Sequence, residues 1–393
     1  MAALDGLRIL DMTQYEAGTA CTQCLAWLGA DVVKVEAPGT GDPGRSLMGL
    51  SDYFMVWNSN KRSIALDLRS PEGRDILLKM APHYDVFVEN YGPGVIEKLD
   101  IGYDAMRAVK PDIIYARIKG FGLDGPWADY KCYDMVAQAA AGAFSITGEP
   151  DGPPMRPGPT TGDAGTGVQM ALAIAAAYAQ KLKTGEGQLI ELSMQEAMTY
   201  YLRTATAGTN FGEWAAERTG SGPTPTLRLY PCQGGGPNDY VYLMAVTPRM
   251  WEALCAAIDR KDLLADPRFA DPRTRQKHRE ALEEAISAWT AQRSKYEAMQ
   301  VLAEAGVPAS AVLDTKDLYQ NPHMVSRGFI HEVDHPEKGK MRLLGWPARM
   351  SASQVPIKAA PILGEHSAQV LAEDLALDED SIAELIEAGV VGG

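Results

Sequence analysis

Short apolar runs and helix-like stretches alternate along the first part of the chain. An apolar run at residues 7–12 is followed by a helical pattern at 20–28 and by a β-branched run at 31–36. The strand pattern recurs at 85–89 and 112–117. Strands that alternate with helices are typical of βαβ units, so the chain is predicted to be an α/β protein with a parallel sheet.

The pattern changes further along. A helical pattern at 165–181 ends at Gly185 and Gly187, and a strand at 188–192 and a helix from Met194 follow. Residues 208–237 are rich in Gly, Pro and Thr, which indicates a linker. A strand at 240–246 and mostly helical segments up to residue 306 indicate a smaller domain. Because 393 residues exceed what one core usually serves, we expect a large Rossmann-like domain at 1–224 and 326–393 and a small α+β domain at 225–325. The tail from residue 342 is predicted as a loop followed by short acidic helices.

Ligands of open α/β sheets bind at the carboxyl ends of the strands. The loops after Asp11, Glu36, Glu89 and Lys119 are therefore the first candidates for a site. The common motifs of such loops are absent: residues 13–18 hold one glycine instead of G-x-G-x-x-G, and the chain has no Walker A loop and no G-x-S-x-G turn. Since the six histidines are scattered, carboxylates are left as the candidates for chemistry.

The charge and the cysteines restrict the possible partners. A formal net charge of −14 argues against nucleic-acid binding, which needs a basic surface, but a few local cations can still build a pocket for one anion. The five cysteines indicate neither a disulfide framework nor a metal site. With no signal-peptide pattern and no apolar run of about 18 residues, we expect a cytoplasmic protein without a membrane partner.

Asp163 stands at the start of the long predicted helix, among glycine and proline residues. A carboxylate in that position is commonly an N-cap. The position also suits a nucleophile, because backbone amides and the helix dipole would keep the carboxylate ionised and small neighbours leave room for a substrate. An ionised Asp can attack an activated carbonyl. The residues alone leave both interpretations open.

Several segments follow one another along nearly the whole chain. They include LDGLRILD at 4–11, LGADVVKVE at 28–36, VENYGPG at 88–94, GD at 162–163, KTGEGQ at 183–188 and LGEH at 363–366. In this order they closely resemble the class III CoA-transferases, the family of the formyl-CoA:oxalate and crotonobetainyl-CoA:carnitine enzymes. The resemblance implies an α/β fold and an interlocked homodimer.

The resemblance also implies a reaction. Asp163 would attack the donor thioester to give a mixed anhydride, and the CoA thiolate would return to give an aspartyl-CoA thioester. The acceptor acid would then reverse these steps and take the CoA. The partners would be an acyl-CoA and a carboxylic acid, with the CoA thioester as co-substrate and no permanently bound cofactor. Excluding water would keep the thioester energy in covalent form.

Further site residues are implied by the same resemblance. Asp134 and Glu16 match catalytic positions beside the nucleophile, and Gly220, Ser221 and Gly222 match a glycine-rich loop over the site. The positions that match the CoA pocket are Ala17, Leu66, Asn90, Tyr91, Lys98, Lys131 and Tyr133. Ammonium groups can pair with the phosphates of CoA, and an aromatic ring can pack on its adenine.

Departures from the oxalate enzyme bear on the substrate. Glu16 replaces a Gln, and an extra carboxylate would repel an anionic acceptor and raise the pKa of Asp163 unless it is protonated or paired. Asp134 replaces a longer Glu, and an aromatic residue of the small oxalate pocket is replaced around residues 47–48. We therefore expect a larger acid and weak turnover of oxalate. Arg45 or Arg156 would hold a distal carboxylate, unless they face solvent.

Other chemistries remain open on the same scaffold. An acyl-CoA racemase would need an acid–base pair, but Tyr133 rather than a His precedes Asp134. A CoA-ester hydrolase or lyase could use Glu16 to direct a water molecule. A CoA-binding protein without turnover is a further alternative, against which the intact Gly162-Asp163 pair argues.

Overall fold

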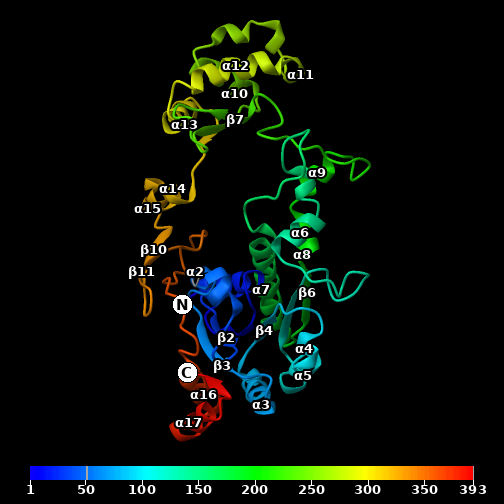
Figure 1. The fold of residues 1–393 in the computed structure, drawn as a ribbon, viewed down its shortest axis with the longest axis vertical. Helices are drawn as coiled ribbons and strands as arrows, with labels where there is room; N and C mark the ends of the chain where they lie inside the picture. The colour runs from blue at the N-terminus through cyan, green and yellow to red at the C-terminus, as the bar shows by residue number, and fades with distance from the viewer. Residues whose placement is uncertain (50–51, 393) are drawn as a thin grey trace. The chain divides into compact units, whose positions relative to one another are not determined.

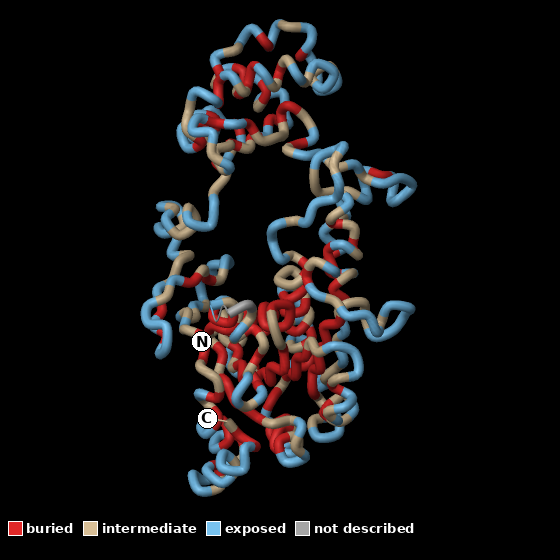
Figure 2. Tube along the Cα trace, in the orientation of Figure 1, coloured by how far each residue is buried: buried red, intermediate tan, exposed pale blue. Residues whose placement is uncertain are grey.

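The computed structural model describes residues 1–49 and 52–392. The chain divides into two compact units. The first comprises Met1–Phe144, Arg156–Ala216 and Phe329–Gly393, and the second comprises Ser145–Met155 and Glu217–Gly328. Each unit has buried residues at its centre, as Figure 2 shows. No helix among the described residues is long and apolar enough to cross a membrane.

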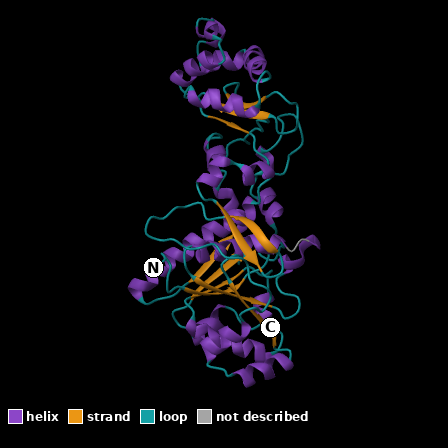
Figure 3. Cartoon of the chain, turned by 90° about the vertical axis from the view of Figure 1, so that its left-hand side faces the viewer, coloured by secondary structure: helices purple, strands orange, loops and turns teal. Residues whose placement is uncertain are grey.

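A seven-stranded sheet forms the centre of the first unit (Figure 3). Its strands are β1 (Arg8–Met12), β2 (Asp31–Glu36), β3 (Arg62–Leu66), β4 (Val86–Glu89), β5 (Ile114–Lys119), β6 (Leu189–Ser193) and β12 (Val391–Gly392). The strand order is β12-β3-β2-β1-β4-β5-β6, and all neighbours pair in parallel except the antiparallel edge pair β12–β3. The predicted α/β class with a parallel sheet is thus confirmed. A separate antiparallel hairpin consists of β10 (Ile330–His335) and β11 (Gly339–Leu344).

Helices cover both faces of this sheet (Figure 1). The helices of the first unit are α1 (Ala17–Trp27), α2 (Asp52–Trp57), α3 (Pro71–Met80), α4 (Val95–Lys98), α5 (Tyr103–Val109), α6 (Asp134–Ala140), α7 (Thr166–Thr184), α8 (Met194–Tyr200), α9 (Arg203–Ala207), α16 (Ser367–Leu375) and α17 (Glu379–Glu387), of which α2 and α9 contribute no described residue to the cores against the sheet. Alternate side chains of each strand enter different cores. On β1, Leu10 belongs to the core formed with α3, α5, α16 and α17, and Ile9 belongs to the core formed with α1 and α7. Burial on both faces explains why the strands read as continuous apolar runs.

The order of strands creates a crevice. From β1 the chain proceeds to β2 and β3 on one side, and β4, β5 and β6 lie on the other side. The loops after β1 and β4 therefore leave the sheet in opposite directions, and ligands of doubly wound sheets bind at this switch point.

The second unit has its own three-stranded antiparallel sheet, in the order β7-β8-β9. Its elements are β7 (Leu227–Pro231), β8 (Tyr240–Met244), α10 (Pro248–Ala257), α11 (Pro272–Lys277), α12 (Arg279–Thr290), α13 (Lys295–Glu304), β9 (Ala309–Ala311), α14 (Thr315–Gln320) and α15 (Pro322–Ser326). Trp251, Leu254 and Ile286 lie in its core.

The sequence patterns did not reveal every element. They gave no signal for β3 or for the two-residue edge strand β12, which pairs Val391 with Leu66. The tail was predicted as a loop and acidic helices, yet it also returns to the large sheet. With two residues, β12 is too short for a periodic pattern, whereas β3 is as long as β1 and is defined by its pairing with β2.

Candidate active site

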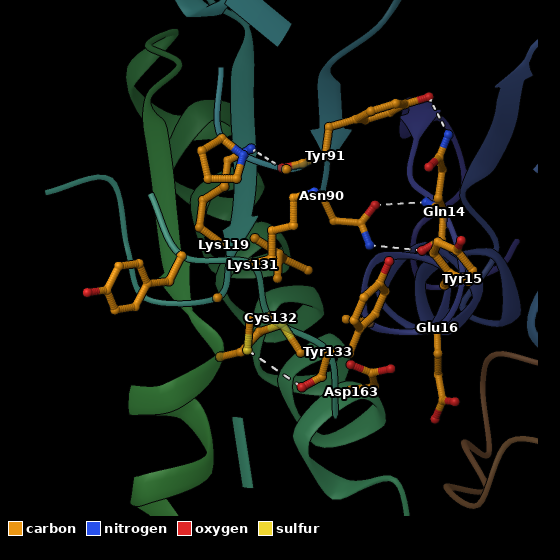
Figure 4. A pocket seen from close by; sticks show the side chains of 17 residues that line it. Gln14, Tyr15, Glu16, Asn90, Tyr91, Lys119, Lys131, Cys132, Tyr133 and Asp163 are labelled. Atoms are coloured by element: carbon orange, nitrogen blue, oxygen red, sulfur yellow. Dashed lines mark hydrogen bonds between the residues drawn. The ribbon is translucent and has the colours of Figure 1, made fainter. Parts of the chain in front are cut away.

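A cavity of about 230 Å³ lies at the carboxyl ends of β1, β4 and β5 (Figure 4). It is lined by residues 14–17, 90–93, 118–120 and 130–133, together with Asp163 and Met194. Three of the four loops expected to form a site therefore surround one space, whereas the loop after Glu36 does not line it. The lining includes Glu16, Ala17, Asn90, Tyr91, Lys131, Tyr133 and Asp163, all of which were candidates from the sequence.

Asp163 lies in a π-helical turn, η4 (Thr161–Gly165), directly before α7. Its carboxylate faces the cavity (Figure 4) and accepts no hydrogen bond from the described residues. Burial, followed by the charges of Glu16 and Asp134, raises its pKa to about 8. The expectation that amides and the helix dipole keep Asp163 ionised is therefore wrong. The N-cap of α7 is Gly165, so Asp163 is not an N-cap either.

Glu16 is buried beside Asp163. Its Oε1 accepts a hydrogen bond from the Thr160 hydroxyl, and its Oε2 accepts one from the Tyr53 hydroxyl at 3.2 Å. Burial is the largest influence and raises the pKa of Glu16 to about 7, although the two hydroxyl groups oppose this rise. The expected effect of Glu16 on the pKa of Asp163 is confirmed, since Glu16 is the second largest cause of that rise.

The backbone turn before Glu16 is held by hydrogen bonds to a buried ion pair. Tyr15 has a φ of 58°, in the left-handed region that non-glycine residues rarely occupy. Its amide donates to Oδ1 of Asp42 at 3.1 Å, and Asp42 pairs with the buried Lys34 at 2.8 Å. Lys34 also donates to the Thr13 carbonyl at 2.6 Å. This buried ion pair therefore fixes the backbone that presents Glu16.

Asn90 joins the loops that follow β1 and β4 (Figure 4). Its Oδ1 accepts from the Gln14 amide at 2.8 Å and its Nδ2 donates to the Gln14 carbonyl at 2.9 Å. The Gln14 side chain donates to the Tyr91 hydroxyl at 2.8 Å, and Lys119 donates to the Tyr91 carbonyl at 2.6 Å. These hydrogen bonds thus connect the two loops across the crevice at the switch point.

Tyr133 and Lys131 lie at the exposed side of the cavity, just before α6. The Tyr133 ring packs edge-to-face on Tyr15, with ring centroids 5.7 Å apart. Cys132 also lines the cavity, but burial raises the pKa of its thiol to about 11, so it is a poor nucleophile at neutral pH.

Some predicted residues lie elsewhere. Lys98 is exposed at the end of α4, and Leu66 is buried in the core at the end of β3. Neither lines the cavity. Asp134, at the start of α6, is buried beneath Asp163 and does not line the cavity either.

The two arginines suggested for a distal carboxylate also lie outside the cavity lining. Arg45 donates to both carboxylate oxygens of Glu36, with distances of 2.7 Å, so its assignment as a substrate ligand is wrong. Arg156 is exposed. Leu47 lies in a 3-10 helix (Pro43–Gly49), and the side chain of Met48 is outside the described part of the chain.

The glycine-rich loop belongs to the second unit. The Ser221 hydroxyl accepts from Arg228 at 2.7 Å. Gly222 has a φ of 153°, and a Cβ atom there would lie 2.1 Å from the Leu227 carbonyl oxygen. The segment is a tight turn against β7, and its role as a cover stays a prediction.

Sequence patterns missed several residues of the site. Gln14, Tyr53 and Thr160 hold the loops and the carboxylates. Gln14 and Thr160 are isolated polar residues in loops and Tyr53 lies on the short helix α2, so none of them gave a periodic signal. Lys119, which also lines the cavity, had a positional hint, because the loop that follows it was a candidate for the site. No group of three His, Cys, Asp or Glu side chains in the described ranges is arranged to hold a metal ion.

Comparison with known proteins places this site in a family. The model of CoA-transferase family III matches residues 4–367. The chain belongs to this family. Among its relatives is a formyl-CoA:oxalate CoA-transferase from Rhodopseudomonas palustris (strain BisA53), 38% identical over 416 residues that cover 99% of this chain and 97% of the relative. Another formyl-CoA:oxalate CoA-transferase, from Streptomyces avermitilis, is 38% identical over 410 residues, with 99% of each chain covered.

Solved structures support the same assignment. A CAIB/BAIF family protein from Brucella suis is similar with a TM-score of 0.84 and 29% identity, covering 95% of this chain and 99% of that one. Rv3272 from Mycobacterium tuberculosis follows with a TM-score of 0.81 and 28% identity, covering 94% and 98%. The resemblance inferred from the sequence is confirmed. As a family III CoA-transferase, the protein is an enzyme whose co-substrate is a CoA thioester.

Proposed function

We propose that this enzyme moves CoA from an acyl-CoA donor to a free carboxylic acid, with Asp163 as the nucleophile. One observation carries the proposal. Asp163 is a carboxylate that lines the cavity without a hydrogen bond from the described residues, whereas the oxygens of Glu16 and Asp134 accept hydrogen bonds from neighbours. An unbonded carboxylate, once ionised, keeps its electron pairs available for attack.

The reaction would proceed through three covalent intermediates, namely an anhydride, aspartyl-CoA and a second anhydride. A carboxylate oxygen of Asp163 bonds to the thioester carbon, and the C–S bond breaks to release the CoA thiolate. The thiolate attacks the aspartyl carbonyl of this anhydride, which frees the donor acid and leaves aspartyl-CoA. The acceptor carboxylate attacks the carbonyl of aspartyl-CoA, and the C–S bond breaks to give a second anhydride and the CoA thiolate. The thiolate then attacks the acyl carbon of this anhydride, which forms the new acyl-CoA and releases the Asp163 carboxylate.

The bound CoA would lie along the lining of the same cavity. Lys131 at the exposed side supplies a cation for phosphate, and Tyr133 offers a ring face for adenine. Ala17, Asn90 and Tyr91 form the wall on the opposite loops.

The acceptor is proposed to differ from oxalate, the acid in the names of the two relatives. Glu16 adds a carboxylate beside the nucleophile, and Arg45, which could have balanced a second substrate charge, is bound to Glu36. A dicarboxylate would therefore meet two acids that line the cavity, Asp163 and Glu16. A larger acid with one carboxylate suits this environment better.

A homodimer is proposed as the working form. Leu172 and Leu182 on α7 are 72% and 70% exposed, and Tyr200 and Tyr201 at the end of the neighbouring α8 are exposed as well. Exposed apolar side chains of this size would be covered in a subunit interface. The interlocked form of the family would bury such surfaces over a large area.

A mass-spectrometric screen tests the proposal. Purified enzyme is incubated with acyl-CoAs crossed with carboxylic acids, including oxalate and larger monocarboxylates, beside Asp163→Ala and the exposed control Asp124→Ala. We expect new acyl-CoA products with the wild type and with Asp124→Ala, none with Asp163→Ala, and slower turnover of oxalate by about tenfold or more. Products that persist in Asp163→Ala would exclude the nucleophile. Release of free CoA without an acceptor would instead identify a hydrolase.

A further inference from the structure

Asp134 contacts Asp163 but has no free face toward the cavity. The residue is 7% exposed. Its Oδ1 accepts a hydrogen bond from the backbone amide of Asp163 at 3.0 Å. Both of its carboxylate oxygens lie 3.0 Å from Nε2 of Gln138. A carboxylate that is enclosed and bonded in this way is poorly placed to exchange a proton with a substrate.

Gln138 completes this contact from within the same helix. It is 0% exposed and stands one turn after Asp134 on α6. Because a carboxylate only accepts hydrogen bonds, the amide nitrogen of Gln138 is the group that faces Asp134. The same nitrogen also donates to the Pro159 carbonyl at 3.0 Å. Gln138 thus connects α6 to the segment that leads into the η4 turn.

The fit between α6 and this turn depends on Gly162. A Cβ atom at that position would lie 2.7 Å from the carbonyl oxygen of Asp134, 2.9 Å from its Oδ1 and 3.1 Å from Cγ of Gln138. Only a glycine allows the turn to approach so closely. The Thr166 hydroxyl donates to the Gly162 carbonyl at 2.5 Å, which ties the turn to α7 on its other side.

We infer that Asp134 and Gln138 are positioning residues. They form a clamp, named here the Asp134–Gln138 clamp, that holds the backbone of η4 and thereby aims the Asp163 carboxylate into the cavity. Asp134 does not act as an acid or base in the reaction. The inference rests on the proposed role of Asp163 as the nucleophile. It also explains why Asp can stand where the oxalate enzyme has a longer Glu, because the side chain needs to reach the next backbone segment rather than the substrate.

Exchanging the two side-chain functions tests the clamp. In Asp134→Asn an amide faces the amide of Gln138, and in Gln138→Glu two carboxylates face each other. In the double variant, which combines both substitutions, the new amide at position 134 donates to the new carboxylate at position 138 and keeps an oxygen for the Asp163 amide. The hydrogen bond between positions 134 and 138 is then restored, with the charge one turn further along α6, but the bond from position 138 to the Pro159 carbonyl is lost, as it also is in Gln138→Glu. The control is Gln169→Glu on α7, because Gln169 donates to the Ala197 carbonyl at 2.9 Å and does not contact Asp134.

The readouts are kcat and KM for the donor acyl-CoA and acceptor pair found in the screen. We expect each single variant to lose about 10- to 100-fold in kcat with KM within about threefold, because misaligned reacting groups cost rate rather than binding. The double variant should recover to within about fivefold of the wild type, and the Gln169→Glu control should stay within about threefold. A folded double variant that is no faster than Gln138→Glu, which lacks the same bond to Pro159, would overturn the inference, since restoring the pair between positions 134 and 138 would then have no effect.

Thermal unfolding of the wild type, the two single variants and the double variant separates this inference from the proposed function. The clamp predicts that the losses in Tm of the two single variants are not additive and that the double variant recovers part of them. Strictly additive losses would count against the clamp whether or not the enzyme turns over. If the wild type exchanges no CoA in the screen, the proposed function fails, and the Tm cycle alone then decides whether the clamp exists.

Discussion

Replacing Glu16 by Gln should change how the reaction depends on pH. The substitution keeps the size of the side chain and an oxygen for the hydroxyl groups of Thr160 or Tyr53, but removes one of the two negative charges beside Asp163. Because the nucleophile must be ionised to attack, the rate of the covalent step should follow the ionised fraction of Asp163.

The size of the effect follows from the causes of the raised pKa. Burial and the two neighbouring acids raise the pKa of Asp163 from 3.8 to about 8, with burial as the largest cause. Glu16 therefore accounts for less than half of the rise, and we expect its removal to lower the midpoint by about 1 pH unit. At pH 8 about 50% of Asp163 is ionised beside a charged Glu16, against about 90% in Glu16→Gln. At pH 6 the two proteins should converge, because Glu16, with a pKa of about 7, is then protonated itself.

The assay is single-turnover formation of the aspartyl-CoA adduct, followed by intact-protein mass spectrometry between pH 5.5 and 9 at constant ionic strength. In the wild type the rate should rise with pH over a broad range, since the two acids release their protons in coupled steps. In Glu16→Gln the rate should follow the titration of a single proton, with a lower midpoint. Glu72→Gln, on the exposed surface of α3, is the control and should leave the curve unchanged. A midpoint in Glu16→Gln that stays in place or rises would refute the electrostatic coupling of the two carboxylates.

Three further predictions concern stability. The folded state holds the Asp163 proton up to about pH 8, whereas the unfolded state loses it near pH 4. Wild-type stability should therefore fall as pH rises through this window, and the Tm gain of Asp163→Asn should grow from pH 5 to pH 9. A Tm difference between the two proteins that does not change with pH would contradict the raised pKa. Asp42→Asn leaves the buried Lys34 without its partner and should cost about 3–5 kcal/mol in urea unfolding, whereas a loss below about 1 kcal/mol would show that the pair is solvated. Gly167→Ala would place a Cβ atom 2.5 Å from a carbonyl oxygen of α1 and should lower the free energy of unfolding by about 1–3 kcal/mol. The control Gly158→Ala, with no atom within 4 Å of the new Cβ, should change it by less than about 0.5 kcal/mol. Equal losses in both variants would disprove the close helix contact.

Local pattern was informative wherever an element is long or buried on both sides. The predicted helix at 165–181 appears as α7, Thr166–Thr184, and ends at Gly185, whose φ of 74° suits glycine. The apolar runs became the central strands because both of their faces are covered by helices. β3 and β12 escaped prediction because their pairing is decided by residues far away in the chain.

The sequence by itself determined the family, the α/β class and Asp163 as the candidate nucleophile, because motif order and local periodicity are written in neighbouring residues. The tertiary structure alone decided the chemical state and the surroundings of that residue. Thr160 and Glu16 bond to each other although they lie 144 positions apart, and Asp134 turns out to hold the Asp163 backbone instead of facing the cavity. Burial and charge proximity set a pKa, and both depend on which distant segments the fold brings together.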